Sequence, residues 1–212
     1  MNISIRSLGV VLPEEGALSI PDFDLKNYPV APKTYLDRSS ALALAACGLA
    51  LQNANLSGPL GEKFGLCIGT QFGAVQTMAG FESKLAEAGA KTVSPLLFSH
   101  SGFNAPAAII SIEWGIRGHH APFCGARSGL DAIEAARDVL RLGQADKMLC
   151  GAVEADSPAR RLSGEDDEQG EGAIFLVLER NGNGEPLEEW LEKSRQISGN
   201  WGALSELLTR LA

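Results

Sequence analysis

The sequence is poor in the residues that build metal and disulfide sites. It has only three histidines and four cysteines among 212 residues, and its aromatic content is 6%. The cysteines, at positions 47, 67, 124 and 150, contain no C-x-x-C pair, which argues against a structural zinc site. Basic residues are also scarce, since 18 Lys and Arg stand against 26 Asp and Glu and leave a net charge of -8. A surface of this sign repels phosphate backbones, so no nucleic-acid partner is expected.

Long apolar runs are missing as well. The longest uncharged stretch, residues 39–61, has an apolar part of about 14 residues, shorter than the ~20 that span a bilayer. The N-terminus has no basic segment followed by an apolar run and a cleavage site, so it does not read as a signal peptide. We therefore expect a cytoplasmic protein without a membrane span, whose thiols are reduced and mostly buried.

What the sequence does contain is a regular alternation of short apolar runs and helical stretches, which is typical of an α/β domain with a mixed sheet. Strands are predicted at residues 3–11, 65–70, 119–124, 147–151 and 173–178. The strand at 119–124 contains Pro122, which predicts a sheet edge or an interface. Helices are predicted at 41–52, from 75 to the glycine at 89, around 107–114, from 128 to the glycine at 143, and within 187–211.

The helix ends and loops follow from polar and proline residues. Ser39 or Ser40 is predicted to cap the first helix, and Ser128 with Asp131 to form a capping box on the helix that follows the strand at 119–124. A loop is expected around Pro95. The acidic stretch 160–171 is expected to be a solvated loop, because it has no apolar residue after its start.

Two local patterns have plain structural explanations. The turn between Gly69 and Gly73 matches neither dinucleotide nor P-loop fingerprints, so structural glycines are preferred over nucleotide binding. His119 and His120 are adjacent, so on a strand they point to opposite faces and cannot both bind one metal. Together with His100 they make only a weak three-histidine pattern, and we expect no metal.

The strand-turn-helix junction at residues 119–129 is the most informative feature. It resembles a nucleophile elbow, but Ser128 stands one place late for that motif. Free N–H groups and the positive end of the helix dipole at such a junction would lower a thiol pKa and bind an oxyanion. A thioester enzyme would place its cysteine here, and the sequence has Ala126.

From this point the chain resembles the N-terminal half of a β-ketoacyl synthase of the thiolase superfamily. The matching segments are YLDR (35–38), GLCIGTQFGA (65–74), SPLLFSHSGFNAPAAIISIEWGIRG (94–118), CGARSGLDAIEAARDVLRLGQADKMLCGAVEA (124–155) and EGAIFLVLE (171–179). The resemblance implies that residues 1–212 are a single β-ketoacyl synthase N-terminal-like domain without a cofactor. Its expected fold is half of a thiolase-like fold, an α-β-α layered structure with a mixed sheet.

The resemblance also implies that the catalytic apparatus is incomplete. In that family A-C-[AS]-S-G carries the acyl-accepting cysteine, and aligning Ser128 and Gly129 with it places the cysteine at Ala126, where a methyl group forms no thioester. The family's two catalytic histidines belong to a C-terminal half beyond the matching segments. Cys124, two residues earlier, would face the same side as Ala126 in an extended strand, but a buried small residue is the favoured interpretation.

A function follows as an expectation from the resemblance. The chain is similar to the inactive chain-length-factor subunits of type II polyketide synthases, which pair with an active β-ketoacyl synthase through the strand before the nucleophile. Truncated versions of such subunits resemble the ones that serve aryl-polyene pigment assembly in bacteria. An acidic acyl carrier protein would bind the partner, since this chain is acidic too. The expected tunnel or interface residues are Phe98, Phe103, His119, His120, Ala121, Phe123, Cys124 and Arg127.

Three alternatives stay open. Arg127 is either a side chain that fills the vacant site or reaches across the interface, or an ordinary surface residue. The chain could be an acyl-thioester transferase or hydrolase that uses Cys124 or Ser128, in which case a thioester or fluorophosphonate probe would label it. It could also be a homodimeric scaffold that ignores ketosynthases.

Overall fold

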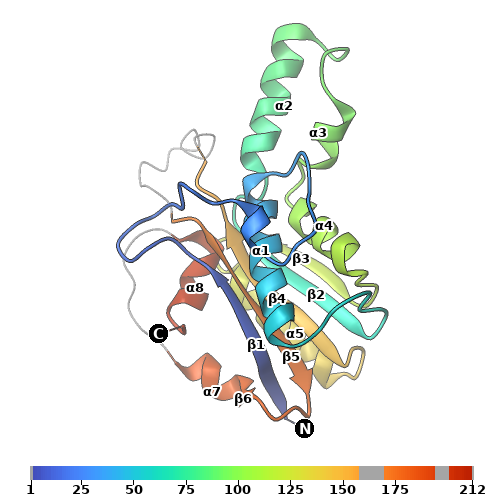
Figure 1. The fold of residues 1–212 in the computed structure, drawn as a ribbon, viewed down its shortest axis with the longest axis vertical. Helices are drawn as coiled ribbons and strands as arrows, with labels where there is room; N and C mark the ends of the chain where they lie inside the picture. Colours follow the sequence, from blue (N-terminus) through green and yellow to red (C-terminus); the bar gives the residue numbers. More distant parts are fainter. Residues whose placement is uncertain (1, 158–169, 194–200, 212) are drawn as a thin grey trace.

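One mixed sheet of six strands organises the chain. The computed structural model describes residues 2–157, 170–193 and 201–211. The strand order is β3-β2-β4-β5-β1-β6, in which β2 is parallel to β3 and β4 and all other pairs are antiparallel (Figure 1). The strands are β1 (Ile3–Val11), β2 (Phe64–Thr70), β3 (His120–Cys124), β4 (Lys147–Glu154), β5 (Gly172–Arg180) and β6 (Glu185–Pro186). The five predicted strands and the edge position of β3 are confirmed.

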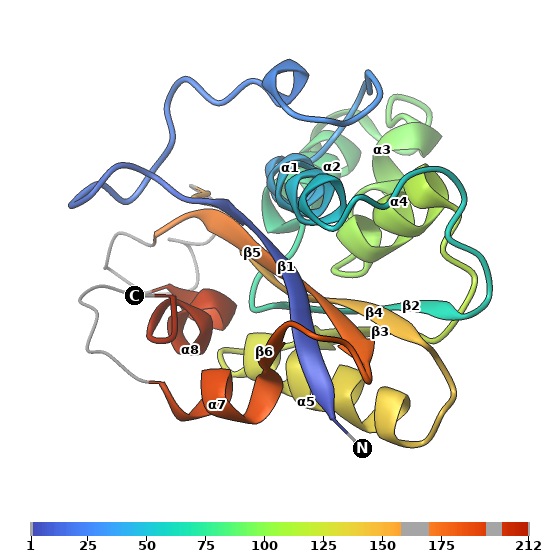
Figure 2. The same cartoon turned by 60° about the horizontal axis from the view of Figure 1, so that its bottom comes forward.

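Helices cover both faces of the sheet. In Figure 2 the helices α1 and α4 lie on one side of the strands, and α5, α7 and α8 lie on the other. The helices are α1 (Arg38–Asn53), α2 (Val75–Ala88), α3 (Pro95–Ser99), α4 (Ala105–Trp114), α5 (Ser128–Arg141), α7 (Leu187–Glu192) and α8 (Ser205–Leu208), with 3-10 turns η1 (Leu25–Asn27) and η2 (Gly202–Leu204). The predicted α-β-α layering is confirmed.

The sheet therefore has a separate apolar core on each face. Strand β5 contributes to both, because successive side chains of a strand point to opposite faces. Phe175 and Val177 pack with the α1 and α4 side, while Ile174 and Leu176 pack with the α5 side. A strand covered on both faces reads as a continuous apolar run, which is why AIFLVL was recognisable as a strand.

Helix α1 lies unusually close to strand β1. A Cβ atom added to Gly9 would lie 2.0 Å from the carbonyl oxygen of Ala46. Only glycine permits this approach, and it lets the nearly all-apolar helix fill the space above the sheet. The cap of α1 differs from the prediction, because the Asp37 carboxylate, rather than Ser39 or Ser40, accepts the backbone N–H of Ser39 at 2.8 Å.

Two predicted loops also need correction. The stretch around Pro95 forms the short helix α3, which the side chain of Ser94 caps. Most of the acidic stretch 160–171 lies outside the described residues, but its last residue, Glu171, is buried at 3% exposure. Glu171 is not solvated because it pairs with Arg38 at 2.7 Å, which replaces water around the carboxylate.

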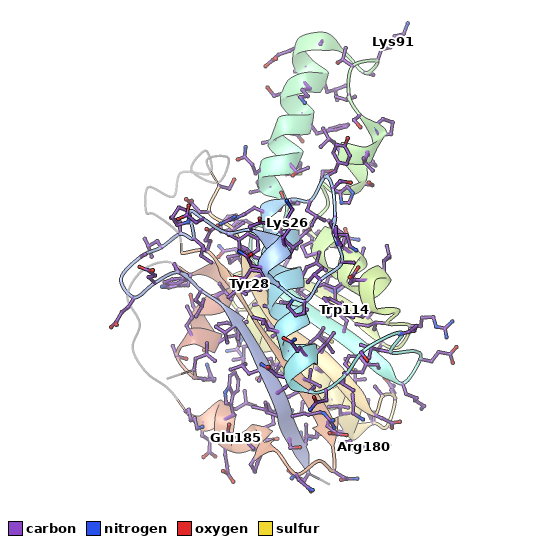
Figure 3. All side chains as sticks on the ribbon, in the orientation of Figure 1. Lys26, Tyr28, Lys91, Trp114, Arg180 and Glu185 are labelled. Atoms are coloured by element: carbon purple, nitrogen blue, oxygen red, sulfur yellow. The ribbon has the colours of Figure 1, made fainter. Side chains whose placement is uncertain are left out.

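One part of the chain projects from the layered body. Helices α2 and α3, with the segment between them, stand beyond the end of the sheet, and Lys91 lies at their far tip (Figures 1 and 3). The predicted helix from Val75 is confirmed with the bounds Val75–Ala88, yet none of its residues is buried. Within the described residues its apolar side is covered only in part, by the contact of Phe81 with Phe98 of α3. In these same residues, no helix has both the length and the apolar character needed to cross a membrane.

Candidate functional site: the β3–α5 junction

The candidate site lies where the parallel strands β2, β3 and β4 end together. The backbone N–H of Gly125 donates to the carbonyl of Thr70 at 3.1 Å, which ties the end of β3 to the end of β2. The backbone N–H of Gln71 donates to the buried side chain of Glu154 at the end of β4. In open α/β sheets ligands bind at the carboxyl ends of parallel strands, so this is the expected place for a site.

A sharp turn joins β3 to α5 and presents Ala126. Gly125 has φ of +135°, a backbone conformation that favours glycine. Ala126 is exposed, and α5 begins two residues later at Ser128. The N–H of Ser128 donates to the carbonyl of Gly125 and that of Leu130 to the carbonyl of Arg127, each at 3.0 Å. The side chain beside this positive end of the helix dipole is only a methyl group.

The predicted capping box on α5 is wrong. Arg127 holds the N-cap position and makes no side-chain cap bond, while Ser128 is the first helical residue. The Ser128 hydroxyl is buried without a hydrogen-bond partner among the described residues. Asp131, the other predicted member of the box, instead pairs with Arg127 at 3.4 Å.

Glycines explain why α5 starts at this place. A Cβ atom on Gly69 would lie 2.3 Å from the carbonyl carbon of Ser128, so β2 and the start of α5 are in backbone contact. Gly73 has φ of +54° and donates its N–H to the Thr70 hydroxyl at 2.9 Å. The structural interpretation of the glycine turn is thereby supported, since both glycines serve chain geometry.

The four thiols differ sharply in their surroundings. Cys47, Cys67 and Cys150 are buried, as predicted for reduced cysteines. Burial raises the pKa of Cys67 to about 12, and burial raises the pKa of Cys47 and Cys150 well above their ordinary value. Cys124 is exposed, which corrects the interpretation of it as a buried small residue, and its thiol donates to the carbonyl of Gln71 at 3.4 Å.

The histidines at the start of β3 lie at the opposite end of that strand from the junction. Both His119 and His120 are exposed. In the parts of the chain that the structure describes, no three His, Cys, Asp or Glu side chains gather where they could hold a metal ion. The strand itself has partly buried side chains at Ala121 and Phe123, which pack against the core beneath α5.

The projecting segment reaches the junction at its base. A Cβ atom on Gly73 would lie 2.8 Å from the Cα of Phe103, so Phe103 sits against the turn that follows β2. The thiol of Cys124 contacts Gln71 in the same turn. The turn at residues 70–73 therefore lies between Phe103 and the end of β3.

We call residues 75–103 the apolar arm. Its exposed large apolar side chains are Met78 (42%), Leu85 (39%), Leu96 (45%), Phe98 (66%) and Phe103 (48%). The ring of Phe98 lies 5.6 Å from that of Phe81, centroid to centroid. Sequence reasoning pointed to Phe98 and Phe103 but not to Leu96, although the helical spacing of the apolar residues could have identified an apolar face here.

Arg127 does not occupy the space beside Ala126. Its side chain is 60% exposed and pairs along its own helix with Asp131 at 3.4 Å and Glu134 at 3.7 Å. Of the two interpretations considered for Arg127, these contacts favour a surface side chain.

The fold and the site together define the class of protein. A mixed sheet between helical layers, with a strand-turn-helix junction at the ends of its parallel strands, is the thiolase-like α/β arrangement. Residues 12–166 match the family described as the β-ketoacyl synthase N-terminal domain, and the chain belongs to this family.

The sequence relatives are 3-oxoacyl-(acyl-carrier-protein) synthases. The chain is 26% identical over 171 residues to 3-oxoacyl-(acyl-carrier-protein) synthase 2 of Staphylococcus aureus. The aligned region covers 68% of this chain and 41% of that protein. It is 32% identical over 103 residues to the Mycobacterium leprae enzyme of the same name, covering 46% of this chain and 23% of that one. The chain thus spans about two fifths of the length of the longer-matching relative.

Solved structures share the fold. The ishigamide ketosynthase/chain length factor superposes with a TM-score of 0.72 at 22% identity, over 88% of this chain and 64% of that one. A type II PKS acyl-carrier protein in complex with its ketosynthase bound to the hexaketide gives a TM-score of 0.71 at 21% identity, over 85% and 62% of the two chains. These similarities establish the common fold.

Proposed function

We propose that this chain is a non-catalytic ketosynthase-like subunit. It pairs with an active β-ketoacyl-ACP synthase in fatty acid or polyketide-type chain elongation, stabilises that enzyme and helps to set the acyl chain length. The observation that carries the proposal is Ala126, exposed at the β3–α5 junction where the family's nucleophile is expected. A methyl group accepts no acyl chain, so the partner has to supply the nucleophile.

Neighbouring nucleophiles do not take over the role in this proposal. Ser128 is 1% exposed and lies under the first turn of α5, so a substrate carbonyl has no approach to it. Cys124 belongs to the strand, before the turn at Gly125, and its thiol is directed to the carbonyl of Gln71. Cys124 does not stand at the helix N-terminus, where a thiolate is stabilised, and Ser128, the first residue of α5, is buried there.

Two uncovered features support pairing with another chain. Strand β3 is the end strand of the sheet, and the apolar arm beside it exposes several large apolar side chains. Contiguous exposed apolar surface is typical of an interaction site. The name of one structural neighbour, a ketosynthase/chain length factor, describes an assembly of this kind.

The chain-length role is steric. Phe98 and Phe103 project from the arm, and Ala121 and Phe123 lie on the strand at the proposed interface. In the proposed complex these side chains line the far part of the partner's acyl tunnel, and their volume limits the growing chain. Aryl-polyene assembly is the pathway that the sequence resemblance suggests.

The net charge of this chain bears on which subunit binds the acyl carrier protein. A net charge of -8 repels an acidic acyl carrier protein, so in the proposal the carrier docks on the partner and reaches this chain only indirectly.

Co-expression with a ketosynthase of the same host, followed by light-scattering mass after size exclusion, tests the proposal. We expect a 1:1 complex whose ketosynthase activity falls when this chain is omitted. A homodimer of this chain that never binds the synthase would instead identify a scaffold and overturn the proposal.

Introducing a thiol tests the vacant position itself. The A126C variant places a thiol at the N-terminus of α5, where the helix dipole favours the thiolate, so we expect an acyl-thioester probe to modify it. Wild type should remain unmodified at residues 126 and 128. The A126S variant is the matched control, since it adds a polar atom without a thiol.

A second function rests on the exposure of Cys124. As an acyl-thioester transferase, the chain would form a thioester on that sulfur with release of the donor thiol. Labelling of wild type by the thioester probe, lost in the Cys124→Ala variant, would support this function over the first.

A further inference from the structure

The edge of strand β3 that lies next to β2 has its backbone groups hydrogen-bonded to β2. The N–H of Leu66 donates to the carbonyl of His119 at 2.8 Å, and the N–H of Gly125 donates to the carbonyl of Thr70 at 3.1 Å. The parallel register between these two bonds pairs Leu66 with His120 and Thr70 with Cys124. In β3, the odd-numbered residues from 119 to 125 therefore turn their backbone groups toward β2.

The even-numbered residues turn theirs to the outer edge, because successive residues of a strand alternate. These are His120, Pro122 and Cys124. They offer three carbonyl acceptors but only two N–H donors, since proline has none. The missing donor is in the middle of the edge.

A strand is the occupant that fits such an edge. Within residues 2–157, 170–193 and 201–211, β3 pairs only with β2. An open row of N–H and C=O groups is a template for another strand, and proline on that row limits which strand can pair. The row therefore restricts the sequence of its partner.

Two copies of this chain fit each other poorly through this edge. In the antiparallel arrangement centred on Pro122, His120 of each copy faces Cys124 of the other. Each of these two pairs makes two backbone N–H to C=O hydrogen bonds. The two prolines then face each other, and two carbonyls lack donors. Every antiparallel register that includes Pro122 of both copies loses two donors, whereas pairing with a strand that has no proline loses one.

We infer that Pro122 makes the β3 edge selective for a non-identical strand over a second copy of this chain. The occupant is an antiparallel edge strand of the partner subunit, with a backbone N–H opposite the carbonyl of Pro122. The identity of that partner as a ketosynthase rests on the proposed function; the discrimination against self-pairing follows from the backbone of β3 alone.

The P122A variant tests the inference in the full chain. The substitution restores one backbone N–H donor in a heterodimer and two in a homodimer. One net hydrogen bond is worth roughly a two- to tenfold change in affinity. We expect self-association, measured by sedimentation equilibrium, to strengthen by about tenfold, and affinity for the ketosynthase to rise by a smaller factor. The P122V variant, whose side chain suits a strand, should behave in the same way.

The P32A variant is the control for loss of a proline, because Pro32 lies in an exposed segment away from β3. It should leave both affinities unchanged. The inference is overturned if folded P122A and P122V self-associate no better than wild type, or if wild type already forms a homodimer as tight as theirs. If no complex with the ketosynthase forms, the proposed function is wrong. The self-association of wild type, P122A and P122V still tests the role of Pro122 in that case.

Discussion

Strands β5 and β3 belong to the same sheet but lie in opposite surroundings. Strand β5 has strands on both edges and helices over both faces, and its residues 172–178 are buried. Strand β3 pairs on one edge only among the residues that the structure describes, and its two ends are exposed. The nearby apolar arm exposes five large apolar side chains, whereas those of β5 between residues 172 and 178 are all buried. The buried core is therefore built around β5, whereas β3 lies at the edge of the sheet.

The largest difference should appear between two phenylalanines. Phe175 is 0% exposed and Phe98 is 66% exposed. Phe175→Ala should lower the free energy of unfolding by about 3–5 kcal/mol, because it removes a buried ring and leaves a cavity. Phe98→Ala should change it by less than about 0.5 kcal/mol. Urea unfolding of both variants measures the difference, and equal losses would refute the division.

A partly buried ion pair ties the N-terminal connection to the body. Glu171 accepts hydrogen bonds from Arg38 at 2.7 and 3.1 Å and from the backbone N–H of Ile20 at 2.7 Å. Glu171→Gln should cost about 2 kcal/mol, less than for a fully buried pair, because Arg38 is one-third exposed. Glu14→Gln, at an exposed position, is the control in thermal unfolding; a similar small loss in both variants would contradict the assignment.

The apolar arm should affect binding without affecting folding. Phe98→Ser removes an exposed ring, so the stability of the free chain should hardly change, while affinity for the ketosynthase should fall by about tenfold. Leu142→Ser is the matched control, because Leu142 is 72% exposed but lies at the far end of α5. Isothermal titration calorimetry of each variant with the ketosynthase compares the contributions of the arm and of the far end of α5 to the affinity. An equal loss for Leu142→Ser would remove the special role of the arm.

The smallest effect is expected at Glu179, on the side of the sheet away from β3. Burial raises the pKa of Glu179, but hydrogen bonds from Lys147 and Arg6 outweigh it, so the pKa lies below the ordinary 4.5. A carboxyl whose folded pKa is lowered stabilises the fold above its unfolded pKa and loses that contribution as pH falls through the folded value.

Glu179→Gln should therefore be less stable than wild type at neutral pH, and the difference should shrink as the pH falls below about 4.5. Thermal unfolding across pH 2–7 measures this convergence. Glu82→Gln, on the exposed arm, provides the baseline. A constant difference between wild type and Glu179→Gln down to the lowest pH would contradict the assigned pairs.

The sequence predicted the parts of the fold that short-range patterns determine. Apolar runs located the strands, and the spacing in residues 128–143 located α5. The cap of α5 was mispredicted because the helix begins in backbone contact with Gly69 and the Ser128 hydroxyl is buried, which spacing does not reveal. Glu171 was assigned to a solvated loop because its cationic partner, Arg38, is 133 residues away in the chain.

The candidate site divides in the same way. The interpretation of Ala126 as a vacant nucleophile position came from the resemblance to a family motif at the start of a helix, and it stays a prediction. The exposure of Cys124 and of the apolar arm depends on which surfaces the rest of the chain covers, so it needed the structure. The donor gap at Pro122 required the register of β3 on β2.

Residue-resolved amide hydrogen exchange, with and without the bound ketosynthase, tests most directly whether a partner strand covers β3. The amides of His120 and Cys124 face the outer edge, so we expect their exchange to slow by at least about tenfold in the complex. The amides of Ala121 and Phe123, which face β2, should change little and serve as internal controls. Equally fast exchange of His120 and Cys124 in the free and bound chains would contradict the account.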